Sequence, residues 1–225
     1  MNIVTGTADT LPAGLLFDMA HYRYRVFVER LGWQLQHHGR LELDQFDRRD
    51  TLYVIARQRG GELRGVARLL PTDQPYLLAT AFAQLLPGRP LPRSPEIWEL
   101  SRFAAVDLDA SGREGTRFGA SEVALALLRG AMQLAAQRGA RALVTASPIG
   151  IERLLRIAGI AASRMAPPVA IGGHRMFACR IELSSTRPAP ASASGGDGGT
   201  LAPLSRAVPV RPRSPRRRSC SPISV

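Results

Sequence analysis

The chain has 225 residues, of which 45% are hydrophobic, so it can form one domain with a substantial core and is short for two. It contains 30 basic residues, all of them arginine, against 18 acidic residues, which gives a net charge of +12. No run of about 18 apolar residues occurs, so we expect no membrane-spanning helix. The first residues also lack the basic and apolar regions of a secretory signal.

Half of the net charge lies in residues 184–225, which contain seven arginines and one acidic residue. This segment is rich in serine, proline, alanine and glycine, and such a composition predicts a disordered tail after a folded domain at residues 1–183. A basic chain suits a nucleic acid or an acidic protein equally well. The folded part has no recognisable nucleic-acid-binding motif, so no nucleic-acid partner is expected for it.

Two cysteines, Cys179 and Cys220, are too few for a disulfide framework. We therefore expect a reducing, cytoplasmic location. The neighbouring histidines His37 and His38 do not make a metal site on their own, and no metal is expected.

In the first half of the chain, apolar residues recur at helical spacing over residues 12–30 and predict a helix. Two β-branched runs at residues 51–56 and 65–70 flank a Gly-Gly pair and predict a β-hairpin. A short helix is expected at residues 79–86.

The second half adds three strands and two helices, with a glycine-bearing loop before the first helix. We place the strands at 97–106, 141–147 and 176–183, the helices at 121–138 and 151–158, and the loop at 113–119. This order of elements indicates an α/β fold, a three-layer sandwich around a mixed central sheet.

Chemistry-bearing residues follow a regular spacing. A phenylalanine lies four residues after an arginine, a tryptophan six residues later, then two aspartates, another arginine and a Glu-x-x-Arg pair: Arg23, Phe27, Trp33, Asp44, Asp47, Arg68, Glu99 and Arg102. Over residues 3–183 this pattern resembles the acyl-homoserine-lactone synthases, the autoinducer synthases of bacterial quorum sensing. The resemblance implies an acetyltransferase-like (GNAT-like) fold.

The residues themselves give a physical reason for this pattern. Arg23 and Phe27 lie four apart, so on a helix they share one face. An arginine on a largely apolar helix needs a buried anionic partner, which Asp44, Asp47 or Glu99 can supply. Phe27 and Trp33 are equally consistent with ordinary core aromatics when each is taken alone.

The resemblance implies acyl transfer from an acyl carrier protein to the amine of S-adenosyl-L-methionine, followed by lactonisation and release of methylthioadenosine. S-adenosylmethionine is then a substrate, and no cofactor is expected. The implied binding residues for this substrate are Arg23, Phe27, Trp33, Asp44, Asp47, Arg68 and Phe103. Glu99 and Arg102 are the catalytic candidates, with Glu99 as the general base.

An acyl pocket is expected between the sheet and the long helix, with Phe82, Ser101, Thr145 and Ser147 in its wall. Thr145 and Ser147 lie two apart in a strand and face the same side, where a hydroxyl can bond a 3-oxo group or the protein backbone. By resemblance, Arg153 and Arg156 lie on the helix that docks the acidic carrier protein.

Two other functions are compatible with the sequence. The first is an acyl-CoA-dependent N-acyltransferase of the same fold, although the segment Arg113–Gly119 lacks the glycine pattern of a pyrophosphate-binding loop. The second is a basic nucleic-acid-binding module that works through the arginine-rich tail.

Overall fold

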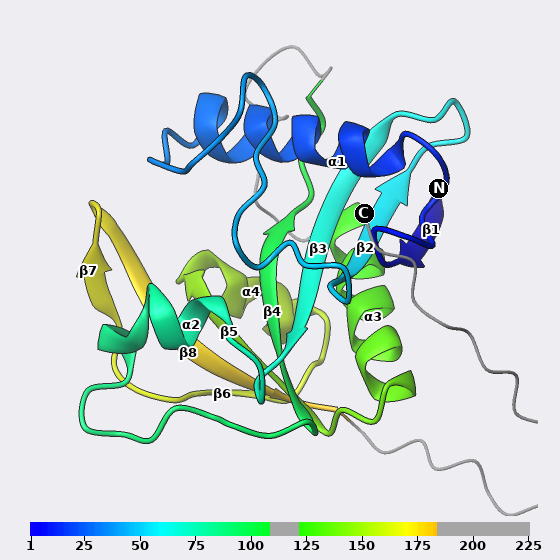
Figure 1. Ribbon diagram of the computed structural model, residues 1–225. Helices are drawn as coiled ribbons and strands as arrows, with labels where there is room; N and C mark the ends of the chain where they lie inside the picture. Colours follow the sequence, from blue (N-terminus) through cyan, green and yellow to red (C-terminus); the bar gives the residue numbers. More distant parts are fainter. Residues whose placement is uncertain (109–121, 184–225) are drawn as a thin grey trace, which may run out of the picture. The chain divides into compact units, whose positions relative to one another are not determined.

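The computed structural model describes residues 1–108 and 122–183. Within these ranges eight strands form one mixed sheet in the order β1-β2-β3-β4-β5-β8-β6, with β7 paired to β8 (Figure 1). The strands are β1 (Asn2–Gly6), β2 (Leu52–Arg57), β3 (Leu63–Pro71), β4 (Ile97–Ala104), β5 (Ala142–Pro148), β6 (Ala162–Arg164), β7 (Val169–Ile171) and β8 (His174–Glu182). β4 and β5 are parallel, and the other described pairs are antiparallel.

The helical segments lie on both faces of this sheet. They are α1 (Leu15–Arg23), the π-helix η1 (Tyr24–Arg30), α2 (Leu77–Thr80), the 3-10 turn η2 (Ala83–Leu85), α3 (Glu122–Gln137) and α4 (Gly150–Ile157). α1 runs directly into η1, so the chain stays helical while the bonding changes to a wider turn. Such π segments are rare and often occur at functional sites.

Helix α3 covers one face because its apolar residues recur on one side. Leu127, Leu128 and Ala131 are fully buried against strand residues such as Val54 and Leu69. In the middle of the helix, a Cβ on Gly130 would come within 3.1 Å of Ile3 and 3.4 Å of Val54. Glycine therefore permits the helix to lie close to β1 and β2. α4 adds Leu154 and Leu155 to the same core.

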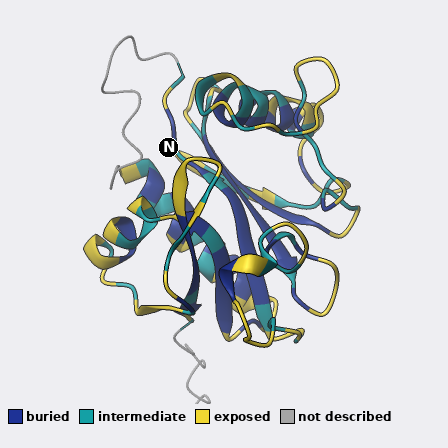
Figure 2. Cartoon of the chain, turned by 90° about the vertical axis from the view of Figure 1, so that its left-hand side faces the viewer, coloured by how far each residue is buried: buried dark blue, intermediate teal, exposed yellow. Residues whose placement is uncertain are grey.

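The opposite face carries two smaller apolar clusters. One joins α1 and η1 to β2 and β3, and the other joins α2 and η2 to β3, β5 and β8. The central strands are buried, and the exposed residues gather on helices and loops (Figure 2). Helices on both faces of a mixed sheet confirm the predicted three-layer α/β sandwich.

Strand β4 departs from regular strand pairing in two places, one opposite β3 and one opposite β5. Opposite β3, the register shifts so that Arg102 and Phe103 together face one residue of the partner strand, and Arg102 has a φ of 49°. This is a β-bulge, and a positive φ is uncommon outside glycine. Opposite β5, pairing stops at Glu99 and Val144 although both strands continue. The two strands therefore separate at their carboxyl ends.

The structure confirms the five predicted strands to within about two residues. The helix predicted at 79–86 is instead two short segments, α2 and η2, and the helix predicted at 12–30 begins at Leu15. Strands β1, β6 and β7 were missed. The loop at 113–119 and the tail at 184–225 lie outside the described residues. None of the described helices has the length and apolar content needed to cross a membrane.

Candidate active site

Three arginines and three carboxylates form a buried ionic network on the face covered by α1. The network consists of Arg23, Arg68, Arg102, Glu42, Asp44 and Asp47. Their formal charges balance. The three arginines come from α1, β3 and β4, and the three carboxylates come from the segment between η1 and β2.

Arg23 is the most deeply enclosed member, with no exposed side-chain surface. Its Nε donates to Glu42 Oε2 at 2.5 Å, and its Nη1 and Nη2 donate to Asp47 at 2.7 and 3.0 Å. The backbone N–H of Glu42 donates to the carbonyl of Ala20, which ties the acidic segment to α1. Tyr53 adds an O–H donor to Asp47 at 3.0 Å. The guanidinium thus has two carboxylate partners, as a buried cation requires.

Arg68 and Arg102 complete the network from the sheet. Arg68 donates to both oxygens of Asp44 at 2.6 and 3.1 Å, and its Nε donates to Ser101 Oγ at 3.1 Å. Arg102 Nη2 donates to Glu42 at 3.0 Å and to Asp44 at 2.8 Å. Glu42 therefore joins Arg23 to Arg102, and Asp44 joins Arg68 to Arg102.

Burial and charge act in opposite directions on these groups. Burial favours the neutral form of Glu42, but the nearby Arg23 and Arg102 outweigh it and lower the pKa of this carboxyl. Likewise, burial disfavours the charge on Asp47, yet Arg23 and Arg68 hold its pKa far below the usual range. Burial works against the charge of Arg23, and its two carboxylate partners raise its pKa all the same. Arg23, Glu42 and Asp47 are therefore ionised at neutral pH.

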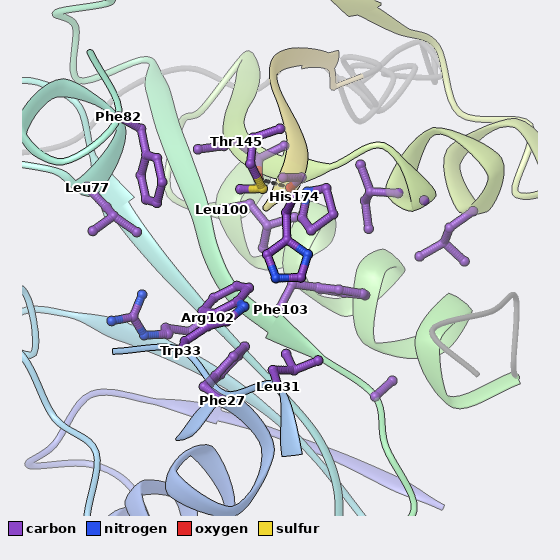
Figure 3. A pocket seen from close by; sticks show the side chains of 18 of the residues that line it. Phe27, Leu31, Trp33, Leu77, Phe82, Leu100, Arg102, Phe103, Thr145 and His174 are labelled. Atoms are coloured by element: carbon purple, nitrogen blue, oxygen red, sulfur yellow. Dashed lines mark hydrogen bonds between the residues drawn. The ribbon is translucent and has the colours of Figure 1, made fainter. Parts of the chain in front are cut away.

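A cavity of about 250 Å³ lies where β4 and β5 separate (Figure 3). Its wall is mainly apolar. The lining residues come from η1 and the following loop, α2 and the residues after it, β4, α3, β5, α4 and β8. They include Leu31, Leu77, Phe82, Leu100, Phe103, Ala105, Ala124, Ala146, Ile151, Leu154 and Met176. An apolar space of this kind suits a hydrocarbon chain.

The ionic network and the cavity meet at Arg102, which belongs to the network and also lines the cavity. Phe27 and Trp33 lie beside it as a stacked pair, with ring centroids 5.2 Å apart. The guanidinium carbon of Arg102 lies 5.7 Å from the centre of the Phe27 ring. A charged subsite and an apolar subsite are thus joined through two aromatic rings.

Polar groups inside the cavity are few. Thr145 Oγ1 and Ser147 Oγ lie 2.7 Å apart and both residues line the cavity. His174 also lines the cavity and is labelled with Thr145 in Figure 3. On α4, Leu154 faces the cavity, whereas Arg153 and Arg156 are exposed on the outside of the helix.

Glu99 is fully buried but takes no part in the network. Its Oε2 accepts the backbone N–H of Leu77 at 2.9 Å, and its Oε1 accepts that of Leu78 at 2.6 Å. Burial raises the pKa of this carboxyl, although the two backbone bonds and the charges of Arg68 and Arg102 oppose the change. The described residues that line the cavity do not include Glu99.

The structure therefore brings together most of the residues singled out in the sequence. Arg23, Asp44, Asp47, Arg68 and Arg102 form the network, and Phe27, Trp33, Phe82, Phe103, Thr145 and Ser147 line the cavity. Ser101 and Glu99 lie outside the cavity wall: Ser101 contacts Arg68, and Glu99 contacts α2.

Sequence reasoning gave no role to Glu42, although this residue is the partner shared by two arginines. The available signal was its place between Leu41 and Leu43, which suggests a glutamate drawn toward the interior. The cavity residues Leu31, Leu77 and Met176 were also missed, because an apolar wall has no motif of its own.

Comparisons with known proteins agree with this geometry. The family model for autoinducer synthases matches residues 12–189. An acyl-homoserine-lactone synthase of Acinetobacter nosocomialis is 51% identical over 183 residues, which are 81% of this chain and 100% of that protein. A crystal structure of TofI in a ternary complex with an inhibitor and MTA is 43% identical with a TM-score of 0.70, and the match covers 81% of this chain and 92% of TofI.

Two further solved structures widen the comparison. A CoA-dependent acyl-homoserine lactone synthase, MesI, is 26% identical with a TM-score of 0.68 over 82% of this chain and 90% of MesI. An acyl-CoA N-acyltransferase from Pseudomonas aeruginosa is 15% identical with a TM-score of 0.53, over 80% of this chain and 97% of that one, and shows the fold alone.

The sheet and the structural comparisons define a protein of the GNAT-like fold class. Within that class, the chain belongs to the autoinducer synthase family. Its activity is that of an acyl-homoserine-lactone synthase, which makes a quorum-sensing signal.

Proposed function

We propose that the enzyme transfers an acyl group from an acyl carrier protein to the amine of S-adenosyl-L-methionine and then closes the lactone, releasing methylthioadenosine. The observation that carries this proposal is the contact between a buried ionic network and an apolar cavity at Arg102. One substrate is small and multiply charged, and the other is a hydrocarbon chain. The two neighbouring subsites match these two chemistries.

The charged subsite accounts for S-adenosylmethionine. This substrate carries a carboxylate, an ammonium and a sulfonium, which need cationic, anionic and aromatic partners. We propose that Arg102 and Asp44, which keep some exposed surface, supply the first two kinds of partner, and that the almost fully buried Arg23, Arg68 and Asp47 hold them in place. The stacked pair of Phe27 and Trp33, with Phe103 nearby in the cavity wall, supplies rings for the adenine and the sulfonium. The complex of TofI with MTA supports this assignment, because methylthioadenosine is the product that the second step releases.

The cavity between β4 and β5 is the proposed acyl subsite. Phe82 lies in its wall, and the hydroxyls of Thr145 and Ser147 are the polar groups placed to contact a substituent on the chain. Ser101 borders the network through Arg68, so we propose that it acts where the two subsites meet.

The chemistry has two steps. The amine nitrogen attacks the thioester carbonyl, so a C–N bond forms, the C–S bond breaks and the amine loses a proton. The bulge at Arg102 and Phe103 leaves backbone groups of β4 outside regular pairing, and we propose them as donors to the developing oxyanion. The carboxylate of the methionine portion then attacks its γ-carbon and displaces methylthioadenosine. A sulfonium is already a good leaving group for this step.

The first step needs a neutral amine and therefore a proton acceptor. Glu99 is the general base expected from the sequence, and this role stays a prediction. Its two oxygens face the first backbone N–H groups of α2, and the described cavity wall does not include it.

The donor is proposed to be a carrier protein because Arg153 and Arg156 form an exposed basic pair on α4, next to the cavity wall. The alternative donor is acyl-CoA, which the description of MesI as CoA-dependent favours. The two donors share the thioester and differ in what docks on α4.

The direct test uses the purified full-length protein with isotope-labelled S-adenosylmethionine and either acyl carrier protein thioesters or acyl-CoA. Mass spectrometry should detect a labelled N-acyl-homoserine lactone and methylthioadenosine in equal amounts. An acylated product without lactone closure would contradict the second step. A higher kcat/KM with acyl-CoA than with the acyl carrier protein would show that acyl-CoA is the preferred donor and would contradict the proposed one.

A further inference from the structure

The connection between β3 and β4, residues 72–96, builds one wall of the cavity. Leu77 from α2 and Phe82 from the following turn lie on one side of the cavity in Figure 3. α2 has four residues and η2 has three. Helices this short are not stable through their own hydrogen bonds, so the position of this wall depends on anchors from elsewhere.

Few hydrogen bonds anchor this connection near α2. Tyr76, which precedes the helix, provides no side-chain cap, and its hydroxyl donates to the carbonyl of Pro92 at 2.6 Å within the same connection. Arg48 is half-buried and donates to the carbonyl of Pro75 at 2.8 Å. Besides the apolar packing of Leu78 and Leu85, the buried link from α2 to the sheet among the described hydrogen bonds is the carboxylate of Glu99.

Glu99 meets α2 with the geometry of a helix cap supplied by another element. Its two oxygens accept the N–H groups of Leu77 and Leu78 at 2.9 and 2.6 Å. These are the first two residues of the helix, whose N–H groups have no partner within it. Because Glu99 belongs to the central strand β4, the contact fixes the helix relative to the sheet. Leu78 is fully buried beside it, while Leu77 faces the cavity.

We propose that Glu99 is a positioning residue that holds α2 against β4 and so sets the acyl-chain wall at Leu77 and Phe82, instead of accepting the proton of the substrate amine. This deepens the proposed function and rests on it for the choice of substrates. A glutamine at this position keeps one acceptor but turns an NH₂ group toward a second N–H donor, so it should loosen the helix. If Glu99 were the general base, the same substitution would remove the proton acceptor completely.

The kinetic test compares Glu99→Gln with wild type using butanoyl, octanoyl and dodecanoyl donors. Positioning predicts a KM that rises about tenfold for the dodecanoyl donor and about twofold or less for the butanoyl donor, with the acidic limb of the pH profile unchanged. Leu77→Ala should show the same dependence on chain length. A kcat that falls about 100-fold or more with every donor, together with loss of the acidic limb, would overturn the proposal in favour of a base.

Hydrogen exchange provides a readout that does not depend on activity. In Glu99→Gln the amides of residues 77–82 should exchange about tenfold faster or more, while those of α3 stay as in wild type. The matched control is Glu96→Gln, at an exposed glutamate that pairs with Arg141 at 3.2 Å, and it should leave residues 77–82 unchanged. If the amides of α2 exchanged in Glu99→Gln as slowly as in wild type, the positioning role would be contradicted. This outcome does not depend on which substrates the enzyme uses.

One further variant covers the case in which Glu99→Gln does not fold. Tyr76→Phe removes the hydroxyl bond to Pro92 from the same connection and leaves Glu99 in place. It should produce the same preference for short donors in weaker form, with faster exchange at residues 77–82. If Tyr76→Phe and Leu77→Ala changed the KM by the same factor for every donor, relative to wild type, this wall would not select the length of the acyl chain.

Discussion

The ionic network and the cavity proposed to hold the acyl chain are adjacent but differ in construction. In the network each arginine and each carboxylate has a defined partner between 2.5 and 3.1 Å away. In the cavity the wall is mainly apolar and its shape follows from the separation of β4 and β5. Removing one member of a buried charged set leaves an uncompensated charge, whereas an apolar wall tolerates changes that conserve volume. We therefore expect the proposed charged subsite to be rigid and the proposed acyl subsite to accept chains of different length more readily.

The largest effect is expected from Arg23→Ala. This variant leaves Glu42 and Asp47 buried without their principal cation, which should cost about 3–5 kcal/mol in the free energy of unfolding. Urea denaturation measures it. The control is Arg49→Ala, at an exposed pair with Asp9, and should leave the free energy of unfolding almost unchanged. Similar losses of unfolding free energy in the two variants would show that the buried network stabilises the protein no more than an exposed ion pair.

The next effect concerns pH. Because the pKa of Glu42 is lowered in the folded protein, its contribution is present above the unfolded pKa of about 4.3 and is lost as the pH falls below it. Glu42→Gln should therefore be less stable than wild type at neutral pH, and the difference should shrink toward acidic pH. Denaturation curves across pH measure this. The exposed Glu62→Gln should show no such trend, and a Glu42→Gln difference independent of pH would contradict the account.

A change of about tenfold is expected at the proposed docking surface. Arg153→Glu and Arg156→Glu should raise the KM for the acyl carrier protein about tenfold and that for S-adenosylmethionine about twofold or less, since rim charges act on encounter with the partner. Steady-state kinetics with each substrate varied in turn measure both. Arg138→Glu, an exposed arginine just after α3, is the charge-matched control. Equal increases for both substrates would count against docking on α4.

The smallest effect is expected from the hydroxyl pair. Thr145→Val removes the hydrogen-bond partner of Ser147 at nearly constant volume, and one neutral hydrogen bond is worth about 1 kcal/mol. The ratio of kcat/KM for 3-oxo over unsubstituted donors should fall about fivefold. Competition assays with mixed donors measure this ratio. An unchanged ratio would assign the pair to the structure of β5 alone.

The fold was largely predictable from the sequence, because strands such as β2 and β5 are β-branched runs and α3 has a clear apolar face. The short edge strands β6 and β7 and the π-helix η1 depend on tertiary contacts, so no local pattern marks them.

The residue types of the site were predictable as well, but their pairing was not. Arg23 pairs with Glu42 and Asp47, whereas Glu99, also expected near it, caps α2. Which carboxylate meets which arginine depends on the course of the segment before β2 and on the bulge at Arg102. The spacing of residues along the chain predicts neither the course of this segment nor the bulge.

The most direct test of the two joined subsites is a steady-state comparison of one variant from each. Trp33→Leu removes the ring stacked on Phe27, and Ala146→Phe fills part of the cavity on the side of Leu77 and Phe82. We predict that the first raises the KM for S-adenosylmethionine about tenfold and changes the KM for a short acyl donor about twofold or less, although Trp33 also lines the cavity. The second should raise the KM for long acyl donors and leave that for S-adenosylmethionine unchanged. Parallel changes of both constants in both variants would contradict separate charged and apolar subsites.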